Sequence, residues 1–296
     1  MAQHSFLITG ASSGLGLQLA VEALKAGHSV VATARNPTKA AQDHPEVEEL
    51  GGIWYQLDVT HTDTKERVDK VVRERQINVL VNCAGYGILG SLEDTDEDEF
   101  IAQMDTNTYG TMRCIKGALP HFRSLGAEGH ATIVNIGSIV CLTPFPATTA
   151  YAASKAAVEG LSEALAMEVG AFGIRVVLID FGIFRTSFLH SFSKPKEGLG
   201  EAYVGGSVDG TVSFLENLAG KQPGDPVLGA KRIVEVVDGT GLAKDLTKKG
   251  YGPALRVPLG SDSFRGVTSK LEALTEAKTL ETLACSTDFA ENVAAS

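Results

Sequence analysis

The alternation of short apolar runs with longer amphipathic stretches constrains the fold of this chain more than any other feature of its sequence. A short run without polar positions fits a strand buried on both faces, as in a parallel sheet covered by helices. Amphipathic stretches between such runs supply the right-handed crossover connections. The sequence therefore predicts an α/β fold with a doubly wound parallel sheet. The expected strands are Ser5–Thr9, Ser29–Ala34, Ile53–Leu57, Val79–Asn82, Thr132–Ile136, Arg175–Asp180 and Ala254–Pro258.

Helical periodicity marks the connections and the C-terminal part of the chain. Between residues 187 and 226 it fades while Gly, Ser and Pro increase, and a connection of this length predicts a substrate lid. Without an internal repeat or a low-complexity linker, we expect one domain over residues 1–296, with a C-terminal tail over residues 259–296. The expected helices are Leu15–Ala26, Tyr151–Phe172, Val227–Val237 and Asp262–Ala284.

Composition argues against several functions. The net charge of −10 disfavours nucleic acid as a partner, because phosphate binding requires clustered Lys and Arg. No apolar run is long enough to span a bilayer, and an expected strand near Ser5 leaves no room for a signal peptide. We therefore expect a cytoplasmic protein with no membrane span. The acidic run between Glu93 and Glu99 is interpreted as a solvated helix start, with an interaction patch as the alternative.

The cysteines predict neither a metal site nor a disulfide framework. None form a CxxC pair, and no histidine cluster completes a metal-ligand spacing. We expect no metal and reduced thiols. The four cysteines are Cys83, Cys114, Cys141 and Cys285.

A glycine-rich segment joins the first expected strand to the first helix. Gly10 permits the turn, Gly14 lets the backbone approach a ligand, and Gly16 lets the helix pack on the sheet. The helix N-terminus then offers N–H groups to a pyrophosphate. The spacing is GxxxGxG rather than GxGxxG, and a tight strand-to-helix turn is the alternative interpretation. The residues expected to contact the cofactor here are Gly10, Ser12, Ser13, Gly14, Leu15 and Gly16.

The end of the second strand indicates which nicotinamide cofactor would bind. NAD enzymes usually place a carboxylate there for the ribose 2′-hydroxyl, but this strand is followed by Arg35, whose guanidinium suits a 2′-phosphate. NADP(H) is therefore the expected cofactor, with a solvated loop arginine as the alternative. Asp58, with Val59 beside it, is expected at the adenine, although a turn aspartate before Thr60 fits equally well.

Four residues predict acid–base chemistry at a carbonyl. Tyr151 and Lys155 share one helix face, and a nearby ammonium would lower the phenol pKa from about 10. Ser138, after the fifth strand, can hold the substrate oxygen where charge develops. Asn107, in the helix before that strand, is expected to order a water that supplies protons to Lys155. Each of these residues alone also has an ordinary structural interpretation, and the combination carries the prediction.

With these residues in place, the chain resembles the short-chain dehydrogenase/reductase family over roughly residues 5–190. The resemblance implies a Rossmann fold in a single domain, an acid–base role for Tyr151, and a bond from Lys155 to the nicotinamide ribose. It also implies cofactor contacts from Asn82, Ala84 and Gly85. The matching motifs are Thr9–Gly16, Asn82–Gly85, Asn107, Ser138 and Tyr151–Lys155.

The turn after the sixth strand departs from the family pattern, since Phe181-Gly182 replaces the usual Pro-Gly. We expect Gly182, Ile183 and Thr186 to reach the nicotinamide amide nonetheless. Arg35 and the tail that begins Leu259-Gly260-Ser261-Asp262 are similar to NADP-preferring 17β-hydroxysteroid and retinol dehydrogenase relatives. The family also implies a homodimer or homotetramer formed through the helices around Asn107 and Tyr151.

The expected activity is NADPH-dependent reduction of a bulky apolar ketone, or oxidation of the matching secondary alcohol. Aromatic side chains in the expected lid suit such a substrate, although they also fit simple packing of the lid. The alternatives are a non-catalytic NADP-binding sensor or partner protein, and an isomerase or dehydratase on the same scaffold. The residues expected to surround the substrate are Phe181, Phe184, Phe188, Leu189, Phe192, Tyr203, Cys141, Leu142 and Phe145.

Overall fold

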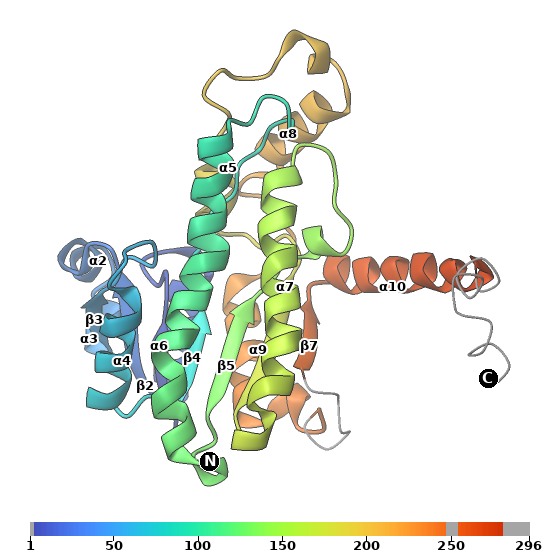
Figure 1. Cartoon of the computed structure of the whole chain (residues 1–296). Helices are drawn as coiled ribbons and strands as arrows, with labels where there is room; N and C mark the ends of the chain where they lie inside the picture. Colours follow the sequence, from blue (N-terminus) through green and yellow to red (C-terminus); the bar gives the residue numbers. More distant parts are fainter. Residues whose placement is uncertain (1–2, 247–253, 281–296) are drawn as a thin grey trace, which may run out of the picture.

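The computed structural model describes residues 3–246 and 254–280, in which a seven-stranded parallel sheet is flanked by helices on both faces (Figure 1). The strand order is β3-β2-β1-β4-β5-β6-β7, with every adjacent pair parallel. The predicted doubly wound sheet is therefore confirmed. The strands are β1 (Ser5–Ile8), β2 (Ser29–Ala34), β3 (Ile53–Gln56), β4 (Val79–Asn82), β5 (Thr132–Ile136), β6 (Arg175–Phe181) and β7 (Ala254–Leu259).

Helices form a layer on each face of this sheet. Helices α1 and α9 pack together on one face, while α4, α6 and α7 cover the other. The helices are α1 (Gly14–Lys25), α2 (Pro37–Asp43), α3 (Glu46–Glu49), α4 (Thr64–Glu74), α5 (Glu97–Met104), α6 (Gly110–Leu125), α7 (Thr149–Val169), α8 (Ser207–Leu218), α9 (Pro226–Asp238) and α10 (Ser261–Glu276).

The two covered faces of the sheet explain why the strands are mostly apolar. In β1, Phe6 and Ile8 enter the core under α1 and α9, whereas Leu7 enters the core under α4 and α6. Strand β4 repeats the division, with Val79 and Val81 on the first side and Leu80 on the second. Because side chains alternate between faces and both faces are covered, most strand positions are apolar, and the buried polar exceptions such as Asn82 and Asn135 are hydrogen-bonded to each other.

Three segments depart from the sequence interpretation. Helix α8 lies inside the expected lid and escapes detection because Leu215 alone is buried along it. Between α5 and α6 the chain forms a π-helical turn, Asp105–Tyr109, rather than a continuous α-helix. The predicted helix Asp262–Ala284 is α10 followed by a 3₁₀ turn, Ala277–Leu280, and its last four residues lie outside the described ranges. Helix α10 projects away from the sheet (Figure 1).

The strand order reverses at β1, which lies between β2 and β4. The chain adds β2 and β3 on one side of β1, and then β4 to β7 on the other side. Loops leaving neighbouring strands in opposite directions open a crevice at the carboxyl edge of such a sheet, and ligands bind there in open α/β folds. Within residues 3–246 and 254–280, no helix is long and apolar enough to cross a membrane.

Candidate functional site

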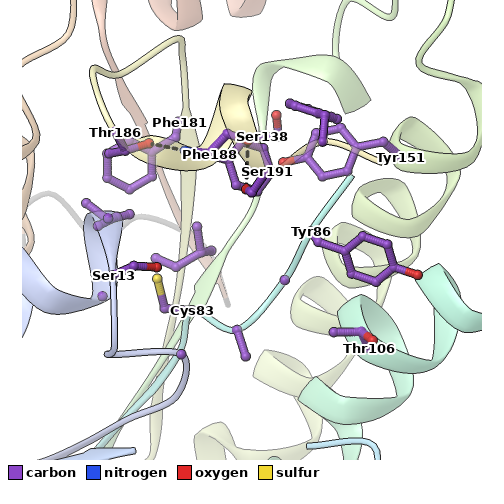
Figure 2. Close-up of a pocket in the computed structure, with 18 of the residues that line it drawn as sticks. Ser13, Cys83, Tyr86, Thr106, Ser138, Tyr151, Phe181, Thr186, Phe188 and Ser191 are labelled. Carbon is purple, nitrogen blue, oxygen red and sulfur yellow. Dashed lines mark hydrogen bonds between the residues drawn. The ribbon is translucent and has the colours of Figure 1, made fainter. Parts of the chain in front are cut away.

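A cavity of about 640 Å³ lies at the carboxyl edge of the sheet, bounded by the loops that follow β1 to β6 and by the 3₁₀ turn Ser187–Ser191 (Figure 2). It brings together most of the residues that the sequence singled out. Asn82 and Asn107 do not line it, nor do three of the expected substrate residues, Tyr203, Cys141 and Leu142. The predicted residues that line it are Gly10, Ser12, Ser13, Gly14, Leu15, Gly16, Arg35, Asp58, Val59, Ala84, Gly85, Ser138, Tyr151, Lys155, Gly182, Ile183 and Thr186.

Steric limits explain the glycines of the first loop. Gly10 has φ +66°, and a Cβ there would lie 2.7 Å from Ala84 Cα, so a side chain would push the β1 and β4 loops apart. A Cβ on Gly16 would lie 2.5 Å from the Gly10 carbonyl oxygen. Ser13, the N-cap of α1, makes no side-chain cap bond to the first helical turn. The N-terminus of α1 therefore faces the cavity without a side-chain cap, which suits an anion.

Arg35 and Asp58 lie at the rim where β2 and β3 end. Arg35 is exposed, whereas Asp58 is partly buried and its Oδ1 accepts hydrogen bonds from Thr60 N at 3.0 Å and Thr60 Oγ1 at 2.7 Å. Burial opposes ionisation of Asp58, but the Thr60 bonds and the nearby His61 and Arg35 outweigh it and lower the pKa of the carboxyl. The turn role that the sequence left open is thus present at a residue that also lines the cavity.

Tyr151, Lys155 and Ser138 are all buried at the inner end of the cavity. Lys155 Nζ donates a hydrogen bond to the Ile136 carbonyl at 2.8 Å and lies 5.9 Å from the centroid of the Tyr151 ring. Burial raises the pKa of Tyr151, an effect that the Ser138 hydroxyl opposes, and burial lowers the pKa of Lys155. The predicted lowering of the phenol pKa by Lys155 is not observed, because burial has the larger effect and Lys155 is bonded elsewhere.

Asn107 lies in the π-helical turn, and its side chain makes three hydrogen bonds to protein partners. Its Oδ1 accepts from Tyr86 N at 3.0 Å, and its Nδ2 donates to Tyr86 O at 2.8 Å and to Ser154 Oγ at 2.9 Å. A Cβ on Gly85 would lie 3.0 Å from the same Oδ1, so a side chain at residue 85 would require Asn107 to move by a few tenths of an ångström. Asn107 thus joins the β4–α5 loop to α7 next to Lys155, and the expected ordering of a water stays a prediction.

Asn82 supports the site from below rather than lining it. It is buried at the end of β4, and its Nδ2 donates to Asn135 Oδ1 at 2.8 Å. Asn135 Nδ2 in turn donates to Ser162 Oγ on α7 at 2.8 Å. This buried chain of amides and a hydroxyl ties β4 and β5 to the helix that carries Tyr151.

The 3₁₀ turn Ser187–Ser191 and the residues after it roof the catalytic end of the cavity. The Phe188 and Phe192 rings pack against Tyr151 at centroid distances of 5.8 and 5.7 Å, and Figure 2 labels Phe188, Ser138 and Tyr151 among the residues that line the cavity. Ser193 pairs with the β4–α5 loop, because its N–H donates to Gly87 O and its carbonyl accepts from Leu89 N, both at 2.9 Å. Two of the aromatic residues expected around the substrate, Phe188 and Phe192, therefore pack on Tyr151, whereas the Phe184 ring packs on Phe181.

The acidic run has a role that sequence reasoning missed. Asp94 Oδ2 accepts from Gly200 N at 3.1 Å, and Glu93 Oε2 accepts from the Tyr203 hydroxyl at 2.9 Å. These two acids hold residues 200–203 of the expected lid, while Glu99 caps the start of α5 through Asp96 N at 3.1 Å. The helix-start interpretation applies to the second half of the run only, and no local sequence signal distinguishes the halves.

The turn after β6 is held from the C-terminal part of the chain. Gly182 N donates to Leu259 O at 2.9 Å, and Ile183 N donates to Asp262 Oδ2 at 2.7 Å. Asp262 was noticed in the sequence only as part of a similar tail, and nothing local reveals its contact with a turn 79 residues away. No group of three or more potential metal ligands occurs in the part of the chain that the structure describes.

Comparisons with known proteins agree with this geometry. The model of the short chain dehydrogenase family matches residues 4–197. The chain is 44% identical over 220 residues to oxidoreductase claN of Passalora fulva, covering 74% of this chain and 99% of that protein. It is 39% identical over 191 residues to a 3-ketodihydrosphingosine reductase of Bacteroides thetaiotaomicron, covering 64% and 66%.

Solved structures give the same result over a greater length. A short-chain dehydrogenase from Streptomyces avermitilis is 34% identical with a TM-score of 0.79, covering 97% of this chain and 100% of that one. The NADP-bound structure of ElxO is 28% identical with a TM-score of 0.67, covering 87% and 98%. The family match spans well over half of the chain, and the fold and the cavity agree with it. The chain belongs to the short-chain dehydrogenase family of oxidoreductases.

Proposed function

We propose that this protein is an NADPH-dependent carbonyl reductase that acts on a bulky, uncharged, apolar ketone. The observation that carries the proposal is the convergence of Ser138, Tyr151 and Lys155 at one end of a single cavity whose other end is the glycine loop. A dinucleotide placed along the cavity would bring its reactive ring to these three side chains.

The residues present fit a nicotinamide dinucleotide. The glycine loop and the N-terminus of α1 would hold the pyrophosphate, since Gly10 and Gly16 leave no side chain in the way. Arg35 at the rim would pair with a 2′-phosphate. Members of the family use NAD or NADP, so the choice of NADP rests on Arg35, and the NADP bound to ElxO supports it.

When bound, the reduced nicotinamide supplies the hydride. The Ser138 hydroxyl would donate a hydrogen bond to the substrate oxygen, and Tyr151 would transfer its phenolic proton to that oxygen as negative charge develops. The Lys155 ammonium would stabilise the resulting phenolate. Burial raises the pKa of Tyr151, so the phenol holds its proton at neutral pH and has it available to donate to the substrate oxygen during reduction.

The substrate end of the cavity explains the preference for an apolar ketone. Of the described residues that line the whole cavity, only Arg35, Asp58 and Lys155 carry charge, and the first two lie at the cofactor rim. Nothing on the substrate side would pair with a carboxylate or phosphate. The name of the Bacteroides relative, a keto reductase, agrees with this substrate class. The residues around the substrate space are Ile139, Val140, Phe145, Phe188, Phe192 and Leu215.

The activity is tested by following NADPH consumption with a panel of apolar ketones. We expect turnover with at least one ketone, and a loss of about 10²–10⁴-fold in kcat for Tyr151→Phe. The control is Tyr109→Phe, at an exposed tyrosine outside the cavity. Full activity of Tyr151→Phe would disprove the mechanism. NADPH binding without turnover of any ketone would instead favour the non-catalytic alternative.

The cofactor preference has its own test. Arg35→Ala should raise the KM for NADPH and leave the KM for NADH nearly unchanged, because only NADPH has the 2′-phosphate. Equal use of both cofactors by the wild type would show that Arg35 has no part in selection.

We further propose a homodimer or homotetramer built through the α5–α6 segment and α7. Large apolar side chains are exposed on this side, including Ile101, Tyr109 and Met167. Light scattering after size exclusion should give a multiple of the 31.1 kDa chain, and Met167→Glu should lower it. A wild type that elutes as a monomer would exclude this assembly.

A further inference from the structure

The turn that follows β6 lacks the rigid proline expected before Gly182 and must be shaped by other contacts. Its far part is well anchored, because Arg185 N donates to Gly224 O at 2.8 Å and Gly224 N donates to Ile183 O at 3.1 Å. The Phe184 ring also packs edge-to-face on Phe181, with the centroids 4.7 Å apart. These contacts leave the Ile183 amide N–H without a backbone acceptor among the described residues, and Asp262 takes it.

Asp262 is placed for this contact by the start of α10. The Ile183 N–H donates to its Oδ2 at 2.7 Å, a short distance for a charge-assisted bond to a backbone amide. The carboxylate also fills the space next to Gly182, where a Cβ would lie 2.0 Å from Asp262 Oδ1. Gly260 turns with φ +105°, and a Cβ there would meet the same oxygen at 2.5 Å. The Asp262 carboxylate therefore fits here because residues 182 and 260 are both glycine.

The first turns of α10 touch the catalytic end of the site at two further points. Ser263 is fully buried and its hydroxyl donates to the Asp180 carbonyl at the end of β6, at 2.7 Å. Gly266 lies so close to Ile139, the residue after Ser138, that a Cβ would meet Ile139 Cδ1 at 2.1 Å. The start of α10 therefore contacts the end of β6, just before the Gly182–Ile183 turn, and also Ile139, in the loop that carries Ser138.

We infer that Asp262 is a positioning residue that sets the Gly182–Ile183 turn for the nicotinamide half of the cofactor. The inference rests on the proposed function, because it assumes that a nicotinamide dinucleotide occupies the cavity. The negative charge is favoured where it stands, near the N-terminus of α10. Loss of the carboxylate frees an amide N–H and opens the space beside Gly182, so the turn loses its defined position while the glycine loop and Arg35 are untouched.

The distinguishing experiment compares two ligands by calorimetry, NADPH and adenosine 2′,5′-bisphosphate, which has the adenine end of NADPH but no nicotinamide. Asp262→Ala should weaken NADPH binding about tenfold, the effect of losing one hydrogen bond to a charged group, and leave the bisphosphate affinity unchanged. Asp262→Asn keeps an acceptor oxygen and should recover most of the loss. If Asp262→Ala loses affinity only for NADPH, the carboxylate positions the nicotinamide half of the site. If the fold were generally damaged, the affinity for both ligands would fall.

Gly182→Ala tests the same contact from the other side. Its methyl group would displace the carboxylate, so the variant should reproduce the Asp262→Ala phenotype in a chain that keeps the charge. In the double variant with Asp262→Ala and Gly182→Ala, the added methyl group has room because the carboxylate is gone. The second substitution should then cost little further NADPH affinity, which is the signature of coupled residues. This variant also keeps the test decisive if Asp262→Ala does not fold.

Asn78→Ala is the matched control, because Asn78 Oδ1 also accepts a distant backbone N–H, that of Ser5 at 2.9 Å, but at the opposite edge of the sheet. It should lower Tm without changing either affinity. Wild-type affinity for NADPH in Asp262→Ala, or equal losses for both ligands, would overturn the inference. A wild type that binds neither ligand would instead refute the proposed function.

Discussion

Replacing Asn107 by alanine separates two roles for this residue, a structural tether and an organiser of water. The side chain makes three hydrogen bonds, two to the Tyr86 backbone and one to Ser154 Oγ. Ser154 keeps its bond to Tyr151 O at 2.7 Å after the change, but the Tyr86 N–H and C=O both lose their partner. A tether predicts that folding stability falls, whereas a residue that only orders water would affect turnover alone.

The magnitude follows from the burial of the groups left behind. An unsatisfied buried polar group costs about 1–3 kcal/mol. Asn107 is 1% exposed, whereas Tyr86 is half-buried at the cavity edge, so water can partly replace the lost bonds. We therefore expect Asn107→Ala to lower the free energy of unfolding by about 2–4 kcal/mol, which corresponds to a fall in Tm of roughly 3–6 °C for a chain of this size.

Urea unfolding is the assay, with the midpoint expected to fall at an unchanged m-value. Asn217→Ala is the control, since Asn217 is exposed on α8 and its Nδ2 bonds only Ser213 O in its own helix, at 2.9 Å. It should change stability by less than about 0.5 kcal/mol. An Asn107→Ala protein as stable as this control would refute the tether, and lost turnover in that protein would point to water ordering.

Three other changes have equally definite outcomes. Gly10→Ala should prevent folding or NADPH binding. Gly126→Ala, at the same φ of +66° and with ψ −175° but with open space around it, should cost only about 1–3 kcal/mol of backbone strain; similar Tm values for the two would contradict the steric argument. Phe192→Ala should expose Tyr151 and lower its raised pKa, so the basic limb of the pH–rate profile should move to lower pH rather than stay in place. Burial raises the pKa of Asp180 to about 7, so between pH 4 and 7 the folded state keeps a proton that the unfolded state has released, and the free energy of unfolding should fall by up to about 1.4 kcal/mol per pH unit. The urea midpoint of Asp180→Asn should depend less steeply on pH than that of the wild type, and an equal dependence would exclude Asp180 as the source.

Much of the architecture is readable from local pattern. Phe6, Leu7 and Ile8 show why, since consecutive side chains enter opposite cores and no polar residue fits between them. The pattern that places the sheet also places strand ends, and the predicted site residues follow those ends. Helix α8 was missed for the converse reason, because one buried leucine leaves no stripe for periodicity to detect.

Short-range spacing and chemistry specific to residue type were enough to predict the parallel sheet, the glycine loop and the candidate site residues Ser138, Tyr151 and Lys155. How those residues are held became visible only in the folded chain. The contacts of Asp262 with Ile183 and of Asp94 with Gly200 join positions 79 and 106 residues apart, and the high pKa of Tyr151 arises from burial under a lid. Long-range hydrogen bonds and desolvation depend on which segments meet in space, and no local pattern encodes that.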